Sequence, residues 1–231
     1  MTDTDGAAGR SALESFGVAV EELAALGARL QPAAFDAAVA LIEAAEGAHG
    51  RVHVTGIGKP EHVAHYVASL LSSTGTPATF LQGTEAIHGS AGQVMSGDVV
   101  VAISNSGETE LVAAVDAVRA LGARIIAVTA NPTSALGQRA DVVLEAGTAR
   151  EGGGLGLAPR SSVAAELLVL AALSAALEER KGFDRAAYHA RHPAGALGRR
   201  SAEAGRRSAE AGRRSAEAGR RSAEAGEEAT D

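Results

Sequence analysis

The sequence predicts an α/β protein whose parallel sheet is covered on both faces by helices. Between residues 51 and 147, five short and largely apolar segments alternate with segments of helical periodicity. This alternation is typical of parallel strands joined by helical crossovers. The core must be aliphatic, because 46% of the residues are hydrophobic and only 3% are aromatic. Glycine, serine and threonine gather where several segments end, and ligands of such sheets bind at the carboxyl ends of the strands.

The predicted elements begin with two helices in residues 11–48, separated by Gln31 and Pro32. Proline suits the first turn of a helix, so Pro32 marks the start of the second one. The expected strands are 51–60, 77–83, 98–107, 124–131 and 141–147, and the expected helices are 61–74, 108–122, 133–140 and 161–180. The last helix is apolar but carries Glu166, and we expect it to be buried in the protein core.

Composition excludes several classes of function. The formal charge of −7 does not favour a nucleic-acid partner. The absence of cysteine excludes a disulfide scaffold, a thiolate metal site and a cysteine nucleophile. No apolar run reaches the roughly 20 residues of a membrane span, and residues 1–10 have no signal-peptide pattern. We therefore expect a cytoplasmic protein that binds no membrane.

Residues 199–231 differ in character from the rest of the chain. The heptapeptide RRSAEAG occurs four times in tandem, which raises the alternative of a coiled coil. Each repeat offers only alanine as an apolar residue and also contains glycine, so it lacks the seam that a coiled coil needs. We predict a disordered tail.

The end of the third predicted strand reads Ser-Asn-Ser-Gly-Glu-Thr and enters a helix. A helix N-terminus offers free N–H groups and a partial positive charge, and hydroxyls beside it complete a phosphate site. Capping of the helix by Ser106 or Thr109 is the structural alternative. Further Gly/Ser/Thr turns lie at 56–60, 72–77 and 159–162, and together they favour a phosphorylated ligand. Patterns for nucleoside triphosphates and dinucleotides are missing.

Six motifs, in the order GIGK, SSTGTP, EAIHG, AISNSGET, GLAPRSS and HPAGALGR, resemble the SIS (sugar isomerase) domain. More narrowly, the sequence is similar to arabinose-5-phosphate isomerases, which interconvert D-arabinose 5-phosphate and D-ribulose 5-phosphate. The resemblance covers about residues 10–200. It implies a three-layer α/β/α sandwich with a five-stranded parallel sheet, a homotetramer and no nucleotide cofactor. We accordingly divide the chain into N-terminal helices (1–50) packing on the domain, a sugar-phosphate SIS domain (51–198) and the tail (199–231).

The resemblance also implies catalytic residues for an enediol mechanism. Lys59 would hold substrate oxygens or stabilise the enediolate, and Glu151 would be the base at C1 and C2. His88 matches an active-site histidine. His192 matches a histidine that the family supplies to the site of a neighbouring subunit. For each residue the alternative is an ordinary surface, loop or helix-end position.

The sequence departs from the family pattern in four places. Glu108 is retained, but Leu111 stands where a second glutamate is usual, and Glu110 is about 100° away on a helix. Lys59 is followed by Pro60 and Glu61 instead of serine and glycine. Arg160 replaces a threonine, where it would offset Glu61 or contact phosphate. Gln82 stands where some members have a metal-binding histidine, so we predict no required metal.

The predicted ligand site combines these turns. We expect substrate contacts from Gly58, Ser73, Thr74, Gly75, Thr76, Ser104, Asn105, Ser106, Thr109, Arg160, Ser161 and Ser162. The regulatory CBS modules that follow GALGR in many members are replaced here by the repeats, so we expect this route of control to be absent.

Three functions fit the sequence. The first is a sugar-phosphate aldose–ketose isomerase of carbohydrate metabolism, acting on arabinose 5-phosphate. The second is a non-catalytic sensor or regulatory module that binds a phosphosugar, favoured by Leu111 and by Pro60–Glu61. The third is an isomerase of another sugar phosphate, such as a phosphohexulose. Retention of Lys59, His88, Glu151 and His192 favours an enzyme.

Overall fold

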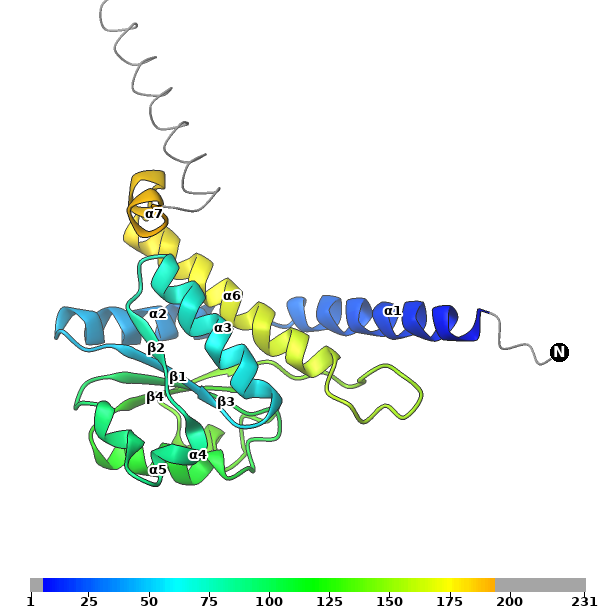
Figure 1. The fold of residues 1–231 in the computed structure, drawn as a ribbon, viewed down its shortest axis with the longest axis horizontal. Coiled ribbons are helices and arrows are strands. Elements are labelled where there is room, and N and C mark those ends of the chain that lie inside the picture. The colour runs from blue at the N-terminus through cyan, green and yellow to red at the C-terminus, as the bar shows by residue number, and fades with distance from the viewer. Residues whose placement is uncertain (1–5, 194–231) are drawn as a thin grey trace, which may run out of the picture.

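A five-stranded parallel sheet forms the centre of the fold, flanked by helices on both faces (Figure 1). The computed structural model describes residues 6–193. The strand order is β2-β1-β3-β4-β5. The strands are β1 (Val52–Gly56), β2 (Ala78–Phe80), β3 (Val99–Ile103), β4 (Arg124–Thr129) and β5 (Val142–Glu145). The predicted three-layer α/β/α sandwich with a five-stranded parallel sheet is therefore confirmed.

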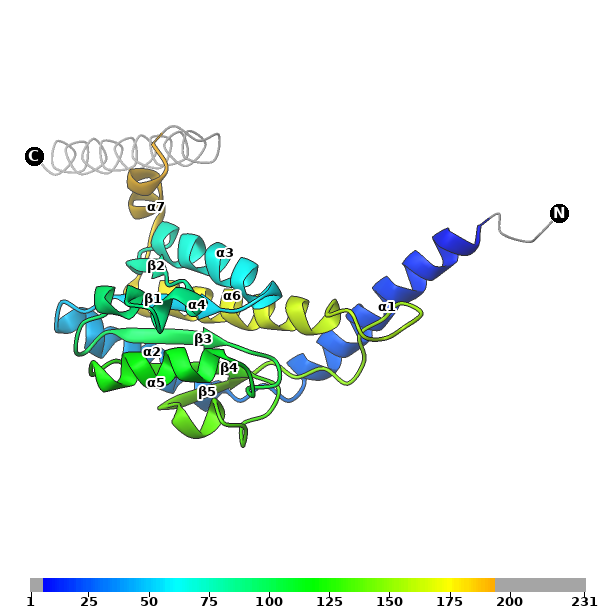
Figure 2. The same cartoon turned by 60° about the horizontal axis from the view of Figure 1, so that its bottom comes forward.

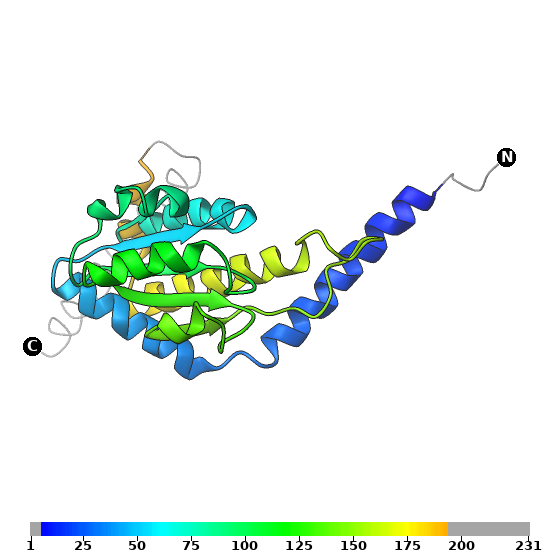
Figure 3. The same cartoon turned by 90° about the horizontal axis from the view of Figure 1, so that it is seen from below.

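Helices follow most of the strands and run back over the sheet. They are α1 (Ala7–Gly27), α2 (Pro32–Gly47), α3 (Lys59–Ser73), α4 (Gly83–Ala86), α5 (Leu111–Ala120), α6 (Ser161–Lys181) and α7 (Arg185–Arg191), with 3-10 turns at Ser90–Gln93 and Gly137–Arg139. Side chains of α2, α3 and α6 form the core on one face, and those of α4 and α5 form it on the other. Figure 2 and Figure 3 show these layers from two further sides.

Strand β3 explains why its segment of the sequence is apolar throughout. Val99, Val101 and Ile103 point into the core beneath α3 and α6. Val100 and Ala102 point into the core beneath α5. Because both faces of a central parallel strand are covered by helices, both sets of side chains must be apolar.

Helix α6 is buried against the rest of the protein. It has 21 residues and is long and apolar enough, by composition, to cross a membrane. Its fully buried side chains, among them Leu170, Leu173 and Leu177, belong to the same core as α2 and α3. The prediction of a core helix is confirmed.

The loops after β3 and β4 are less helical than predicted. Helix α5 begins at Leu111 instead of 108, because the Glu108 carboxylate accepts a hydrogen bond from Ala135 N–H at 2.7 Å. Residues 133–140 form only one 3-10 turn, since Asn131 Oδ1 accepts hydrogen bonds from the N–H and hydroxyl of Thr133. Helices α4 and α7 are short, and the sequence patterns do not predict them.

The two N-terminal helices pack unequally. Helix α2 buries Val39 and Ile42 in the core, whereas α1 buries only Glu22 and Leu26, near its C-terminal end. The first part of α1 extends away from the sheet (Figure 1, Figure 3). It exposes Leu13 and Phe16, by 75% and 71% respectively. The predicted tail, 199–231, lies outside the described residues.

Candidate functional site

A cleft of about 440 Å³ opens at the edge of the sheet where the strands end at their carboxyl termini. We call this side the carboxyl-end edge and the opposite side the amino-end edge. The cleft lies between the turn after β1, the turn after β3, the loop before α6 and the start of α6. Its lining comprises Ile57, Pro60, Ser104, Asn105, Ser106, Thr109, Glu151, Gly156, Leu157, Pro159, Ser162, Val163 and Glu166.

Hydrogen bonds within the turn after β3 hold its hydroxyls in place. Ser104 Oγ accepts from Gly107 N–H at 3.2 Å and lies 3.3 Å from Thr109 Oγ1. Ser106 Oγ accepts from Glu108 N–H at 3.3 Å. Gly107 has φ +68°, and a Cβ there would clash with the Ser134 side chain, so only glycine fits.

The alternative that these hydroxyls cap α5 is not observed. The N-cap of α5 is Glu110, and its side chain makes no capping hydrogen bond. Ser106 and Thr109 belong instead to the preceding turn, whose hydroxyls line the cleft.

The start of α6 forms the opposite wall of the cleft. Glu151 Oε2 accepts hydrogen bonds from the N–H groups of Arg160, at 2.6 Å, and Ser162, at 3.2 Å. A carboxylate is stabilised at this position because the N-terminus of a helix carries a partial positive charge. Both bonds go to the same oxygen, so Oε1 takes no part in them.

Several buried polar atoms at this edge find no hydrogen-bond partner among residues 6–193. They are Thr55 Oγ1, Asn105 Oδ1, Ser161 Oγ, Ser162 Oγ and both carboxyl oxygens of Glu166. Glu166 is only 1% exposed. Burial raises its pKa to about 7, and the negative charge of Glu151 contributes to the same shift. Buried polar groups are normally paired, so these atoms are available to a polar ligand or to water.

The structure brings six of the predicted site residues together. Ser104, Asn105, Ser106, Thr109, Glu151 and Ser162 all line the cleft. Gly58 and Lys59 lie between the lining residues Ile57 and Pro60, and both are exposed. Gly58 has φ +73°, and Lys59 is the first residue of α3. Ser161, next to Ser162, is buried at the base of the same wall.

The carboxylates before α5 do not line the cleft. Glu108 is bound to Ala135 N–H, on the loop after β4, and Glu110 is exposed at the start of α5. Leu111, at the position where the family pattern has a glutamate, is 0% exposed and packs in the core beneath α5. This side of the site thus supplies hydroxyls but no carboxylate.

Two other predicted residues are near the cleft without lining it. The Arg160 guanidinium donates to the carbonyl oxygens of Gly152, at 3.1 Å, and Ala158, at 3.4 Å. It therefore stabilises the loop before α6, and a contact with Glu61 is not among its hydrogen bonds in the described chain. His88 is exposed, just after α4.

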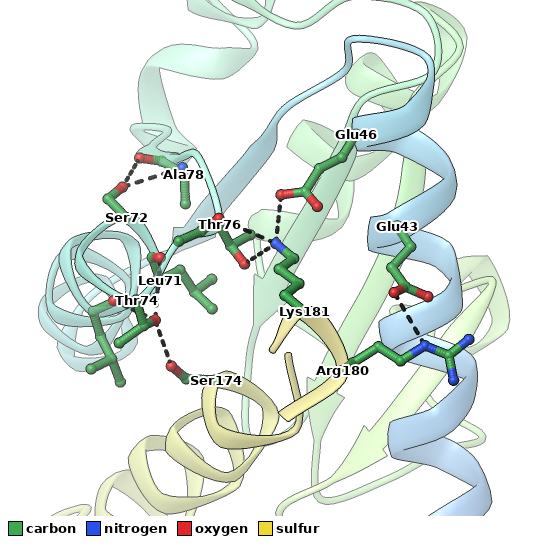
Figure 4. A network of polar contacts seen from close by, with 12 residues as sticks. Glu43, Glu46, Leu71, Ser72, Thr74, Thr76, Ala78, Ser174, Arg180 and Lys181 are labelled. Carbon is green, nitrogen blue, oxygen red and sulfur yellow. Dashed lines mark hydrogen bonds and ion pairs between the residues drawn. The ribbon is translucent and has the colours of Figure 1, made fainter. Parts of the chain in front are cut away.

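The turn 73–76 requires a correction, because it lies at the amino-end edge (Figure 4). Helix α3 runs from the cleft back across the sheet, so its last residue, Ser73, reaches the other side. Thr74 Oγ1 bonds to Leu70 O at 2.9 Å and to Ser174 Oγ at 3.0 Å. Thr76 Oγ1 accepts from Lys181 Nζ at 2.6 Å. Ser73, Thr74, Gly75 and Thr76 are therefore not part of this cleft.

His192 also lies at the amino-end edge, beyond the far end of α6. Helix α6 has 21 residues and spans about 30 Å. The His192 ring stacks on Tyr188 with ring centroids 3.9 Å apart, and its Nδ1 lies 2.9 Å from Tyr188 O. Within one subunit, His192 cannot contact a ligand in the cleft.

The sequence motifs do not predict Glu166 as a site residue. In the sequence this glutamate is only a polar residue within an apolar helix. The available signal was its position four residues after Ser162, because residues i and i+4 share a face of a helix. Among residues 6–193, no three His, Asp or Glu side chains gather in a group that could hold a metal ion.

Comparison with known proteins identifies the family to which the chain belongs. Residues 47–176, more than half of the chain, match the SIS domain model. The chain belongs to the SIS-domain family. The HPAGALGR motif (192–199) and the repeats lie beyond the residues that this match covers.

Relatives of this SIS-domain chain include arabinose 5-phosphate isomerases. It is 45% identical over 152 residues to arabinose 5-phosphate isomerase KdsD of Pseudomonas aeruginosa, and 43% identical over 152 residues to KdsD of Escherichia coli K12. The matches cover 65% of this chain but only 47% and 46% of those proteins. The chain thus spans about half the length of these curated relatives.

A solved structure is also similar. Protein c3406 of Escherichia coli CFT073, in complex with arabinose 5-phosphate, has a TM-score of 0.73 and 34% sequence identity. The similarity covers 84% of this chain and 100% of that one.

Proposed function

We propose that this SIS-domain protein is a sugar-phosphate aldose–ketose isomerase that interconverts D-arabinose 5-phosphate and D-ribulose 5-phosphate. The observation that carries the proposal is the cleft at the carboxyl-end edge, where hydroxyls, a helix N-terminus and a carboxylate converge around unpartnered buried polar atoms. The choice of a pentose 5-phosphate rests on the KdsD relatives and on the relative solved with arabinose 5-phosphate.

The phosphate group lies against the turn after β3 in this proposal. Ser104, Ser106 and Thr109 offer hydroxyls that line the cleft, and Gly107 lets the turn fold closely against Ser134. Hydroxyls bind phosphate oxygens well without a formal positive charge nearby. The first turn of α6, with Ser161 and Ser162, then faces the sugar hydroxyls.

The proton transfers require an acid/base group at the carbon atoms and stabilisation of the enediolate. We assign the first role to Glu151, whose orientation is fixed by the two N–H groups that bind its Oε2. Lys59, at the start of α3, provides the positive charge for the enediolate oxygens. His88, Glu108 and Glu110 do not line the cleft. Their membership of the catalytic site therefore stays a prediction.

We further propose that the active unit is a homotetramer. The exposed apolar side chains of α1, including Leu13 and Phe16, favour burial against another copy. His192 lies too far from the cleft of its own subunit, so it can act only in the site of a neighbour. Sedimentation equilibrium should give four times the mass of 23.1 kDa. A monomer that is fully active would contradict both the tetramer and the role of His192.

The cytoplasmic location of the protein stays a prediction.

The decisive test is turnover. Purified protein mixed with ribulose 5-phosphate in D2O should produce arabinose 5-phosphate carrying deuterium at C2, detected by NMR. Glu151→Gln should lower kcat by about 1,000-fold or more, because the group that moves the carbon-bound proton is lost. Glu179→Gln, on the exposed C-terminal part of α6, is the matched control and should keep full activity. Binding of the sugar phosphate without deuterium incorporation would contradict the proposal.

A non-catalytic phosphosugar sensor is the second candidate. Burial of Leu111 at the position of the family glutamate favours it, as does the replacement of the residues after Lys59 by Pro60 and Glu61. A sensor would bind arabinose 5-phosphate tightly and leave it unchanged. The same NMR experiment distinguishes the two functions, and a panel of hexulose phosphates tests the remaining alternative of another substrate.

A further inference from the structure

Glu166 is the buried group of the cleft that no assigned role explains. It lies in the second turn of α6, one turn below Ser162, and it lines the cleft although the residue is only 1% exposed. Neither carboxyl oxygen has a hydrogen-bond partner in the described part of the chain. A structural role would require such a partner, because a buried carboxyl without one destabilises the fold.

The charged groups around Glu166 do not neutralise it. The elements that surround the cleft carry Lys59, Glu61 and His62 in the first turn of α3, Glu108 and Glu110 before α5, Glu151 in the loop before α6, and Arg160 at the start of α6. The Arg160 guanidinium is bound to loop carbonyls. Glu151 is the neighbour whose charge acts on Glu166, and it repels the ionised form. The pKa of Glu166, about 7, lets the carboxyl both donate and accept a proton near neutral pH.

Among residues 6–193, the lining of the cleft includes no carboxyl group from an element other than α6 and the loop before it. Leu111 is fully buried in the core beneath α5, and Glu108 is engaged with Ala135 N–H. An aldose–ketose isomerase must move one proton between carbons and another between oxygens, and Glu151 is assigned only the first of these transfers. Glu166 lines the same cleft as Glu151. Ser162, whose Oγ is also without a partner in the described residues, lies one helical turn before it on α6.

Resting on the proposed isomerase function, we propose that Glu166 is a catalytic residue that hydrogen-bonds the sugar oxygens O1 and O2 and carries the proton between them. Glu151 removes the hydrogen at C2 of the aldose as a proton, and the C–H electron pair becomes the C1–C2 double bond. Glu166 gives its carboxyl proton to the C1 carbonyl oxygen, which yields the enediol. The Glu166 carboxylate then takes the O2 proton as the C2 carbonyl forms, and Glu151 returns its proton to C1.

The experiment compares the full-length wild type with Glu166→Gln, which keeps the size of the side chain but cannot transfer a proton. With ribulose 5-phosphate we expect kcat to fall by about 100-fold or more, the range for loss of an acid/base group, while KM changes by less than about threefold. The pH dependence of kcat should lose the ionisation near pH 7 that belongs to Glu166. Glu179→Gln is the matched control and should match the wild type in all three readouts.

A second variant keeps the test valid if Glu166→Gln does not fold, as judged by circular dichroism. Glu166→Asp retains the carboxyl on a shorter side chain, so it should keep the ionisation in the pH profile with a lower kcat. A wild-type kcat and pH profile in Glu166→Gln would overturn the role of Glu166 and leave the isomerase intact. In Glu166→Asp, a wild-type kcat together with loss of the ionisation near pH 7 would do the same. A wild type that binds but does not isomerise any sugar phosphate would instead overturn the proposed function, and the role of Glu166 with it.

Discussion

Hydroxyl-rich turns lie at both edges of the sheet, but the hydroxyls at the two edges differ in their hydrogen bonding. At the amino-end edge, Thr74 bonds to Ser174, and Thr76 bonds to Lys181 (Figure 4). At the carboxyl-end edge, Ser162 and Glu166 are buried without a partner in residues 6–193. Serine, threonine and glycine in a turn therefore do not by themselves mark a site. What separates a structural turn from a binding turn is whether its buried polar atoms are already paired.

The buried carboxyl groups of Asp98, at the amino-end edge, and Glu166, at the carboxyl-end edge, differ in the same way. Burial raises the pKa of Asp98, but hydrogen bonds from Met95 N–H, Arg51 N–H and His53 outweigh this effect and lower it below its usual value. The three partners lie at 2.8, 2.8 and 3.0 Å. Burial raises the pKa of Glu166 with no such compensation. Asp98 thus stabilises the fold in its ionised form, whereas ionised Glu166 destabilises it.

The largest effect should come from breaking the paired edge with Asp98→Ala. The substitution leaves two part-buried N–H groups and the buried His53 ring without their acceptor, so we expect the free energy of unfolding to fall by about 3 kcal/mol. Urea denaturation at pH 7 measures this loss. Because the folded pKa of Asp98 is lowered, its contribution is present above the usual value of 3.8 and is lost as the pH falls through the folded pKa. A loss below about 1 kcal/mol at pH 7 would show that the network is not structural.

Glu166→Leu should increase the free energy of unfolding at pH 8, whereas Asp98→Ala should decrease it at pH 7. An acid whose folded pKa is raised from 4.5 to about 7 stabilises the fold below pH 4.5 and loses that contribution as the pH rises through 7. At pH 8 the wild type therefore carries a penalty of up to about 3 kcal/mol, which leucine removes. Thermal unfolding should show the variant gaining stability, relative to the wild type, from pH 5 to pH 8. An equal difference at both pH values would mean that Glu166 has a partner in solution.

Ser104→Ala sharpens the comparison at the carboxyl-end edge. Ser104 Oγ holds Gly107 N–H and faces the cleft, so we expect about tenfold weaker binding of arabinose 5-phosphate, equivalent to about 1.4 kcal/mol. Isothermal titration calorimetry measures the affinity, and the melting temperature serves as a control for folding. Unchanged affinity would remove this turn from the phosphate site.

Thr74→Val should produce the smallest change, and only in stability. Valine has a similar shape but cannot bond to Ser174 Oγ, so about 1 kcal/mol of unfolding free energy should be lost. The affinity for arabinose 5-phosphate, measured under the same conditions, should equal that of the wild type. A loss of affinity here would return the turn 73–76 to the binding site, through contacts with a neighbouring subunit.

Much of the fold can be predicted from the sequence because its strands are buried on both faces. Segments such as 98–103 are continuously apolar, and Pro32 marks the start of α2. The composition of residues 133–140 predicts a helix that the structure does not contain. The chain turns tightly there instead, and the backbone at Gly137 lies so close to the carbonyl oxygen of Pro132 that only glycine fits. The turn depends on the hydrogen bonds that Asn131 Oδ1 accepts from Thr133, which the helical pattern does not report.

The site is less predictable than the fold. The turn after β3 and Glu151 can be found because the end of a parallel strand can be located in the sequence. The assignment of the turn 73–76 to the same site is wrong, because composition does not reveal at which edge a hydroxyl-rich turn lies. Glu166 escapes prediction because its burial and its lack of a partner are properties of the packed structure and not of the helix that carries it.

The projecting half of α1 has a consequence for experiments on assembly. Residues 7–20 bury no side chain within their own chain, and an isolated helix of about this length is only marginally stable in water. Amide hydrogens in this stretch should therefore exchange within seconds in a dilute, dissociated sample and slowly in a concentrated one. Their exchange rate, followed by mass spectrometry, reports directly how much of the protein is assembled.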